Sequence, residues 1–256
     1  MNQALSSSNN WFVCPQPNSK AEMRLFFFPY AGSGPTVFNK WTAGFPSNME
    51  TWIAHYPGRG SRYKESPIKE MLTLVEKINE AIQPLLDKPF IFFGHSLGGM
   101  VAFELIRHLR GLKLPQPNIL FVSACSAPQL PDPHPPIHTL PDTEFIRSLQ
   151  KLNGIPVEVA NHSELMELLL PMLRADFEAI ESYQYTSSES LSCPIVAFGG
   201  DADPRVSRGS LEAWASLTNA SFKSQYFPGD HFFINTAYEA VIASMITATT
   251  LLDAEK

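Results

Sequence analysis

Three residues that lie far apart in the sequence have the types needed for acyl transfer to a serine. Ser96 stands in GHSLG, residues 94–98, which is a Gly-x-Ser-x-Gly pattern, and Asp203 and His231 follow later in the chain. A serine hydroxyl is a poor nucleophile at neutral pH, so it needs a base within hydrogen-bond reach and a third group that fixes the tautomer of that base. The sequence predicts Ser96 as the nucleophile, His231 as the base and Asp203 as the orienting acid.

The residues on either side of the serine predict the turn that would hold it. The run PFIFF, residues 89–93, is short and apolar, which is typical of a strand buried on both faces. After the glycines, MVAFELIRHL places apolar residues at helical spacing. A strand, a Gly-x-Ser-x-Gly turn and a helix in this order describe a nucleophile elbow, and the helix N-terminus beneath the serine favours an oxyanion.

The base and the acid are chosen by position. His231 lies in PGDHFF, between the last predicted strand and the closing helix, and Asp203 fits a turn of the form Gly200-x-x-Asp203 with a proline behind it. Asp201 follows the same strand and stays open as an alternative acid. The other histidines lie in an insertion, in an earlier strand, on the elbow helix or beside the serine, and they suit the role less well: His134, His138, His162, His55, His108 and His95.

A glycine-rich loop earlier in the chain could supply part of an oxyanion hole. The predicted strand RLFFF, residues 24–28, ends at PYAGSG, residues 29–34. Hydrolases with a nucleophile elbow take one donor from the residue after the nucleophile and a second from a loop of this kind. We therefore predict the backbone N–H groups of Ala31 and Leu97 as donors, with an ordinary turn as the alternative for the loop.

The remaining pattern predicts one domain that spans residues 1–256. Short apolar strands alternate with helical stripes, which favours a mostly parallel sheet with helices on both faces. The order Ser, Asp, His, each after a predicted strand, is that of an α/β hydrolase. Beyond the segments above, we expect strands at 51–56, 118–124, 193–200 and 222–227, helices at 71–86 and 236–252, and an edge strand near 11–13.

An insertion at about 128–186 interrupts this alternation. It begins with the proline-rich PQLPDPHPPIHTLP, residues 128–141, which suits neither helix nor central strand. Helical patterns follow near 143–152 and 164–185. An insertion here would lie above the active site as a lid. Its surplus of Leu and Met suits an apolar acyl tunnel, although helix packing alone explains it equally well.

Composition excludes several classes of function. The 256 residues are 44% hydrophobic and carry a net charge of −6, so nothing supports binding to nucleic acid. We find no HxH or HExxH spacing and expect no metal or other cofactor. The three cysteines have no framework spacing, and neither a signal peptide nor a membrane span is recognisable. We therefore expect a cytoplasmic protein.

Taken together, six segments resemble the type II thioesterases of polyketide and nonribosomal peptide synthesis. They are similar also to the medium-chain thioesterase that acts with fatty acid synthase. The resemblance runs from about residue 24 to about residue 246. The segments are FFFPYAGSGPTVFNKW, HYPGRGSR, PFIFFGHSLGGMVAFEL, LPMLRADFEAIESYQY, FGGDADPRV and FPGDHFF.

This resemblance implies a function. Members of that family hydrolyse acyl thioesters on the phosphopantetheine arm of an acyl- or peptidyl-carrier protein, either to remove stalled groups or to release a product. Their triad falls on Ser96, Asp203 and His231. The resemblance thus implies a carrier protein as partner, and we expect the enzyme to be a monomer.

Some positions depart from the family or have open roles. Ser33 stands where the family often has a second glycine. Asp230 replaces a glycine before the histidine and could raise the basicity of His231. Arg59 and the nearby Arg62 could contact a phosphate or an acidic carrier, or brace their own loop. We expect Asp176, with Arg174, to serve the structure of the insertion.

Three other functions remain open. An esterase or lipase would use the same triad on oxygen esters, and turnover of carrier-protein thioesters against aryl esters would distinguish it. A non-catalytic module that binds carrier proteins on a decayed hydrolase fold would not depend on Ser96. Transfer of the acyl group to an amine or alcohol differs only in how well the site admits water.

Overall fold

The computed structural model describes residues 10–254, and the predicted mostly parallel sheet is confirmed there. Seven strands form one sheet in the order β1-β3-β2-β4-β5-β6-β7. All pairs are parallel except β1 with β3, so the segment near residue 12 is the expected edge strand. The strands are β1 Phe12–Val13, β2 Met23–Phe28, β3 Met49–Ala54, β4 Phe90–His95, β5 Ile119–Ser123, β6 Ile195–Gly200 and β7 Phe222–Phe227.

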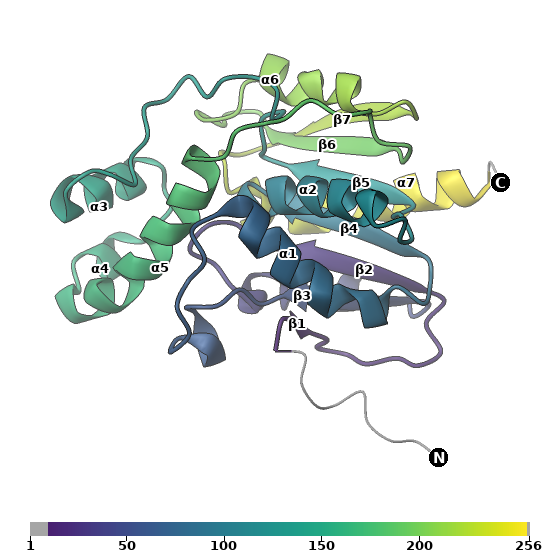
Figure 1. Cartoon of the computed structure of the whole chain (residues 1–256), viewed down its shortest axis with the longest axis horizontal. Coiled ribbons are helices and arrows are strands. Elements are labelled where there is room, and N and C mark those ends of the chain that lie inside the picture. Colours follow the sequence, from purple (N-terminus) through teal and green to yellow (C-terminus); the bar gives the residue numbers. More distant parts are fainter. Residues whose placement is uncertain (1–9, 255–256) are drawn as a thin grey trace.

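Helices cover both faces of this sheet (Figure 1). Because side chains alternate along a strand, Phe26 and Phe92 pack in one core with α1 and α2, whereas Phe27 and Phe93 pack in a second core with α7. The helices that cover the two faces are α1 Met71–Ile82, α2 Leu97–Gly111, α6 Arg208–Glu212 and α7 Tyr238–Ala254. Short 3₁₀ turns lie at Pro35–Phe38, Thr42–Gly44, Gly60–Arg62, Gln83–Leu85, Ala213–Leu217 and Phe233–Asn235.

Several predicted boundaries are wrong by two to four residues; the helix expected at 164–185, for example, ends at Glu181. The strand expected at 51–56 is β3 at Met49–Ala54, because it pairs with β2 from Met23 opposite Met49 onward. His55 follows the last residue of the strand; its N–H donates to the carbonyl of Trp11, and its ring Nε2 lies 3.0 Å from the carbonyl oxygen of Arg59. The helix expected at 71–86 ends at Ile82 and continues as a 3₁₀ turn that contains Pro84, where the ring cannot continue the α-helical hydrogen bonds.

The insertion forms its own cluster of helices beyond one end of the sheet (Figure 1). Its helices are α3 Asp142–Lys151, α4 Val157–Ala160 and α5 Ser163–Glu181. They share a separate small core that includes Phe145, Leu149 and Met172. Since this cluster buries its own apolar surface, packing explains much of its Leu and Met content. Its role as a lid remains a prediction.

Close packing at the start of α2 makes Gly98 a sensitive position. A Cβ atom there would lie 1.9 Å from the carbonyl oxygen of Phe28 and 2.8 Å from that of Pro29, and both contacts are with backbone. Gly98→Ala should therefore lower the free energy of unfolding by about 3 kcal/mol or more. Urea denaturation measures the change.

Gly111, the last residue of the same helix, provides a matched control. A Cβ atom there would meet no heavy atom within 4 Å. Gly111→Ala should leave stability unchanged or raise it by about 0.5 kcal/mol, because alanine loses less conformational freedom than glycine on folding. Equal stabilities of the two variants would contradict the close approach of α2 to β2.

Candidate active site

Ser96 occupies the strained turn that its sequence context predicts. It lies between β4 and α2 with φ of 53° and ψ of −117°, a conformation that is rare for residues other than glycine. Its N–H donates to the carbonyl of Ser123, and its own carbonyl accepts from Gly99, so the backbone is held on both sides. The Ser96 side chain caps no N–H of α2. The hydroxyl is therefore not used to satisfy the helix.

Asp203 and His231 form a hydrogen-bonded pair at the ends of β6 and β7. His231 Nδ1 lies 2.9 Å from Asp203 Oδ2, and the carboxylate side chain is fully buried. The other carboxylate oxygen accepts the N–H groups of Arg205 at 2.8 Å and Val206 at 3.2 Å. Burial raises the pKa of Asp203, but the hydrogen bond and charge of His231 and the backbone donors outweigh it, so the pKa lies below its ordinary value.

Asp201, the alternative acid, has a different partner. Its Oδ1 accepts the N–H of Gly229 at 3.0 Å, so this exposed carboxylate braces the loop before His231. Asp230, the carboxylate that precedes His231, accepts from Asn153 of the insertion and from the N–H of Phe232. The structure therefore brings Asp203, and not Asp201, to the histidine. Its catalytic role remains a prediction.

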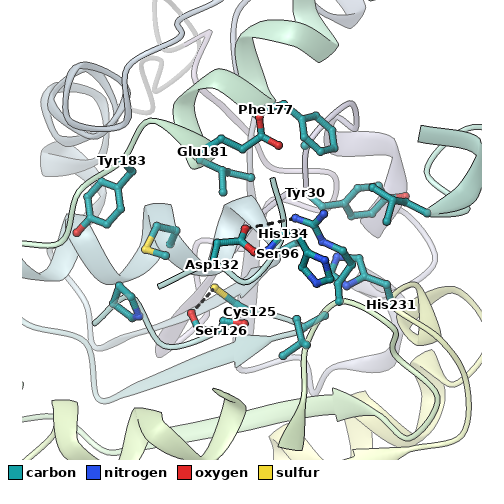
Figure 2. A pocket seen from close by; sticks show the side chains of 18 of the residues that line it. Tyr30, Ser96, Cys125, Ser126, Asp132, His134, Phe177, Glu181, Tyr183 and His231 are labelled. Carbon is teal, nitrogen blue, oxygen red and sulfur yellow. Dashed lines mark hydrogen bonds and ion pairs between the residues drawn. The ribbon is translucent and has the colours of Figure 1, made fainter. Parts of the chain in front are cut away.

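Ser96 and His231 line the same cavity (Figure 2). Within residues 10–254, no hydrogen bond joins the two side chains. Hydrogen bonds between a nucleophile and its base often tighten only in the complex with substrate. The arrangement places the free edge of the imidazole and the serine hydroxyl on one surface that a reacting acyl group can reach.

The two predicted oxyanion donors lie at neighbouring points of the sheet edge. Phe28 is paired with Gly94 in the β2–β4 ladder, so Ala31 and Leu97 each follow a paired residue by three positions. Leu97 begins α2, where an N–H has no acceptor within the helix. Ala31 lines the cavity together with Ser96. Their roles as donors remain predictions, and the register of β2 and β4 supports them.

His95 packs behind His231, a contact that sequence reasoning missed. It is fully buried, its Nδ1 lies 2.8 Å from Ser123 Oγ, and its ring centre lies 5.4 Å from that of His231. Burial, followed by the neighbouring charge of His231, holds the pKa of His95 well below its ordinary value. His95 therefore stays neutral and supports one side of the His231 ring. No pattern around residue 95 in the sequence indicates this.

A cavity of about 670 Å³ opens at this site between the sheet and the insertion. Figure 2 shows Phe177 and Glu181 of α5 across the cavity from Ser96 and His231. The lining mixes apolar residues such as Leu173 and Met100 with the charged residues Asp132 and Arg205, and the acyl tunnel remains a prediction. Its volume suits a ligand of the size of an acyl chain or a short peptide.

The cavity contains a second candidate nucleophile, which its environment makes inert. Cys125 lines the wall near Ser96 and is buried. Burial raises the pKa of this thiol to about 12, so it remains protonated at neutral pH and is a poor nucleophile.

In the described part of the chain, no group of His, Cys, Asp and Glu side chains could hold a metal ion. Among the helices of residues 10–254, none combines the length and the apolar character that a membrane span requires.

Comparison with known proteins gives the family. The model of the thioesterase domain family matches residues 23–249. The chain is 43% identical to the gramicidin S biosynthesis protein GrsT of Aneurinibacillus migulanus, with 98% of each chain covered. It is 40% identical to the linear gramicidin dehydrogenase LgrE of Brevibacillus parabrevis, over 93% of this chain and 91% of that one.

A solved structure agrees with these relatives. The type II thioesterase BorB from the borrelidin biosynthetic cluster is 29% identical, covers 96% of this chain and 99% of its own, and superposes with a TM-score of 0.86. The predicted resemblance to type II thioesterases is thus confirmed, as is the predicted fold class. The chain belongs to the thioesterase domain family, and it is a thioester hydrolase with the α/β-hydrolase fold.

Proposed function

We propose that this enzyme cleaves acyl or peptidyl thioesters from the phosphopantetheine arm of a carrier protein, with Ser96, His231 and Asp203 as its catalytic triad. The observation that carries the proposal is the junction of a strained serine turn and a buried Asp203–His231 pair at one cavity. Relatives named for gramicidin S and borrelidin biosynthesis support a role in assembly-line synthesis. Two backbone N–H groups donate to the other carboxylate oxygen of Asp203 and keep this side chain oriented.

The reaction begins with acyl transfer to the serine. His231 Nε2 takes the proton of the Ser96 hydroxyl as the oxygen attacks the thioester carbonyl carbon. The N–H groups of Ala31 and Leu97 stabilise the oxyanion, and each donor of this kind lowers the barrier by roughly 3–4 kcal/mol. The carbon–sulfur bond breaks, and the imidazolium returns the proton to the departing pantetheine thiol.

Hydrolysis completes the cycle. A water gives its proton to His231 and adds to the carbonyl carbon of the acyl-enzyme, and the same two N–H groups stabilise the second oxyanion. Ser96 leaves with the proton that His231 returns, and the free acid diffuses out. Because Asp203 accepts from Nδ1, the imidazole keeps Nε2 free to receive each proton.

The proposal includes where and how the enzyme works. One chain supplies every residue of the site, so we propose that a monomer is sufficient. Cys14, Cys125 and Cys193 are free thiols, which suits a reducing compartment such as the cytoplasm.

The proposed substrate class is tested with matched thioesters and oxygen esters. The wild-type enzyme is incubated with carrier proteins loaded with acyl and aminoacyl groups, with the same groups on N-acetylcysteamine, and with their 4-nitrophenyl esters. Intact-mass spectrometry follows loss of the acyl group from the carrier. We expect kcat/KM for the carrier thioester to exceed that for the other two by at least about tenfold, since remote contacts with the arm and carrier contribute to transition-state binding. A preference for the oxygen ester would identify an esterase instead.

A further inference from the structure

The loop that holds Ala31 is attached to the insertion through one buried carboxylate. Asp176 lies on α5, and only 2% of its side chain is exposed. Its Oδ2 accepts the N–H of Gly32 at 2.8 Å, across 144 positions of sequence. Beyond the structural role that the sequence predicts for Asp176 in the insertion, this contact shows that Asp176 reaches the loop after β2.

Arg59 completes the attachment. Its Nη2 lies 2.6 Å from Asp176 Oδ1 and its Nη1 lies 2.8 Å from Asp176 Oδ2. The same Nη1 donates to the carbonyl of Ser33 at 3.0 Å, and the guanidinium lies over the ring of Tyr56. The ion pair therefore holds two neighbouring positions of the loop, Gly32 through its N–H and Ser33 through its carbonyl. Arg59 is therefore buried and braces a loop, which is the second of the two roles that its sequence context allows.

The loop is a turn whose central peptide can point in two directions. The N–H of Ser33 donates to the carbonyl of Tyr30 at 3.1 Å, and Gly32 has φ of +79°, which are the features of a type II turn. In a type I turn the peptide between Ala31 and Gly32 would be turned over, and the Gly32 N–H would point away from α5. Asp176 accepts that N–H and so favours the type II arrangement.

The same turn fixes the direction of the predicted oxyanion donor. The Ala31 N–H shares a planar peptide unit with the Tyr30 carbonyl, which accepts both the N–H and the hydroxyl of Ser33. Leu173 of α5 packs on the turn, because a Cβ atom at Gly32 would lie 2.5 Å from Leu173 Cδ2. Ser33 thus holds the peptide that carries the Ala31 N–H, and Asp176 holds the next peptide along the chain.

We propose that Asp176 is a positioning residue that keeps the Ala31 N–H directed at the reacting carbonyl, so that the insertion sets the geometry of the oxyanion hole. The inference rests on the proposed function, because it requires Ala31 to be an oxyanion donor. It goes further by making the docking of α5 a condition for efficient acyl transfer. Displacement of α5 alone would release the turn and would break no hydrogen bond that the structure gives to Ser96 or His231.

Two double variants separate this role from the stability of the ion pair. Arg59→Met combined with Asp176→Asn, and Arg59→Met combined with Asp176→Leu, both remove the charges, so neither leaves a buried charge without its partner. Asparagine and leucine have similar shapes, but only asparagine offers an oxygen to the Gly32 N–H. We expect kcat of the leucine variant to be about 10–100-fold below that of the asparagine variant, with KM equal within about threefold.

Inhibitor binding provides a readout that a structural defect would not reproduce. Ser96 Oγ adds to the carbonyl carbon of an acyl trifluoromethyl ketone, its proton passes to His231, and the adduct oxygen occupies the oxyanion hole. The leucine variant should lose affinity for this ketone in proportion to kcat. Its affinity for the matching pantetheine amide, which remains trigonal, should be unchanged. Thermal unfolding verifies that both variants are folded.

A control removes another contact between the insertion and the rest of the chain. Lys69 and Glu178 of α5 form an ion pair at 3.3 Å that does not touch the turn. Lys69→Met combined with Glu178→Leu should leave kcat within about twofold of wild type, since a partly exposed pair at the surface contributes little. Equal kcat and equal ketone affinity in the two Asp176 variants would overturn the inference. Turnover that persists in Ser96→Ala would instead overturn the proposed function.

Discussion

Ser96→Ala is expected to lower kcat for hydrolysis of an acyl-carrier thioester by about 10⁴–10⁶-fold, because the acyl-enzyme can no longer form. Activity slightly above the background would remain, since the cavity and the predicted N–H donors still bind the substrate. Wild-type enzyme quenched in the first turnover should show the mass of one attached acyl group, and the variant should show none. Intact-mass spectrometry reports both species in one measurement.

Ser126→Ala is the matched control for this substitution. Ser126 lines the same cavity, and its hydroxyl lies 3.3 Å from that of Ser210. We expect its kcat to stay within a few-fold of wild type. Retention of full thioester turnover in Ser96→Ala would leave the nucleophile unassigned. Cys125 would not replace it, because a thiol with a pKa of about 12 is protonated at neutral pH.

The positions of the candidate triad could be predicted because they depend on the sheet. The carboxyl ends of parallel strands meet at one edge, so residues that follow β4, β6 and β7 gather there although they are far apart in sequence. The apolar runs that mark β4 and β6 are unambiguous, whereas β7 is largely polar. For β3, in contrast, apolar residues extend past its end into the loop, so its pattern did not fix the boundary.

The contacts that hold the site could not be predicted, because they join segments that no periodicity relates. Asp176 meets Gly32 only because α5 lies over the loop after β2, and the position of an insertion is not encoded in its own pattern. Arg62, which could have been a phosphate ligand, is buried and donates to the carbonyl of His55 and to Glu65. The presence of an arginine in the sequence did not show whether its side chain binds a ligand or supports its own loop.

Asp203→Asn should lower kcat by about 10²–10⁴-fold. An asparagine at this position can turn its NH₂ group toward His231 Nδ1, which then becomes an acceptor and leaves the proton on Nε2. The imidazole can no longer receive the proton of Ser96. KM for the carrier thioester should change little, because Asp203 is buried behind the histidine and does not line the cavity. Steady-state kinetics on one carrier thioester measures both constants.

The same variant has a second signature in the pH dependence of stability. The pKa of Asp203 is lowered in the folded protein, so its carboxylate adds stability that is fully present above the ordinary pKa and is lost as pH falls through the lower value. Asp203→Asn lacks this titration. As pH falls below about 4, the difference in free energy of unfolding between wild type and variant should therefore change in favour of the variant.

Asp201→Asn decides between the two acids that the sequence left open. An asparagine at 201 keeps an oxygen for the N–H of Gly229, so the loop before His231 should remain in place. Its kcat should stay within a few-fold of wild type. A loss in Asp201→Asn as large as that in Asp203→Asn would mean that charge near the loop matters more than the hydrogen bond to the imidazole. Because only Asp203 contacts His231 at 2.9 Å, we expect the two losses to differ by at least about tenfold.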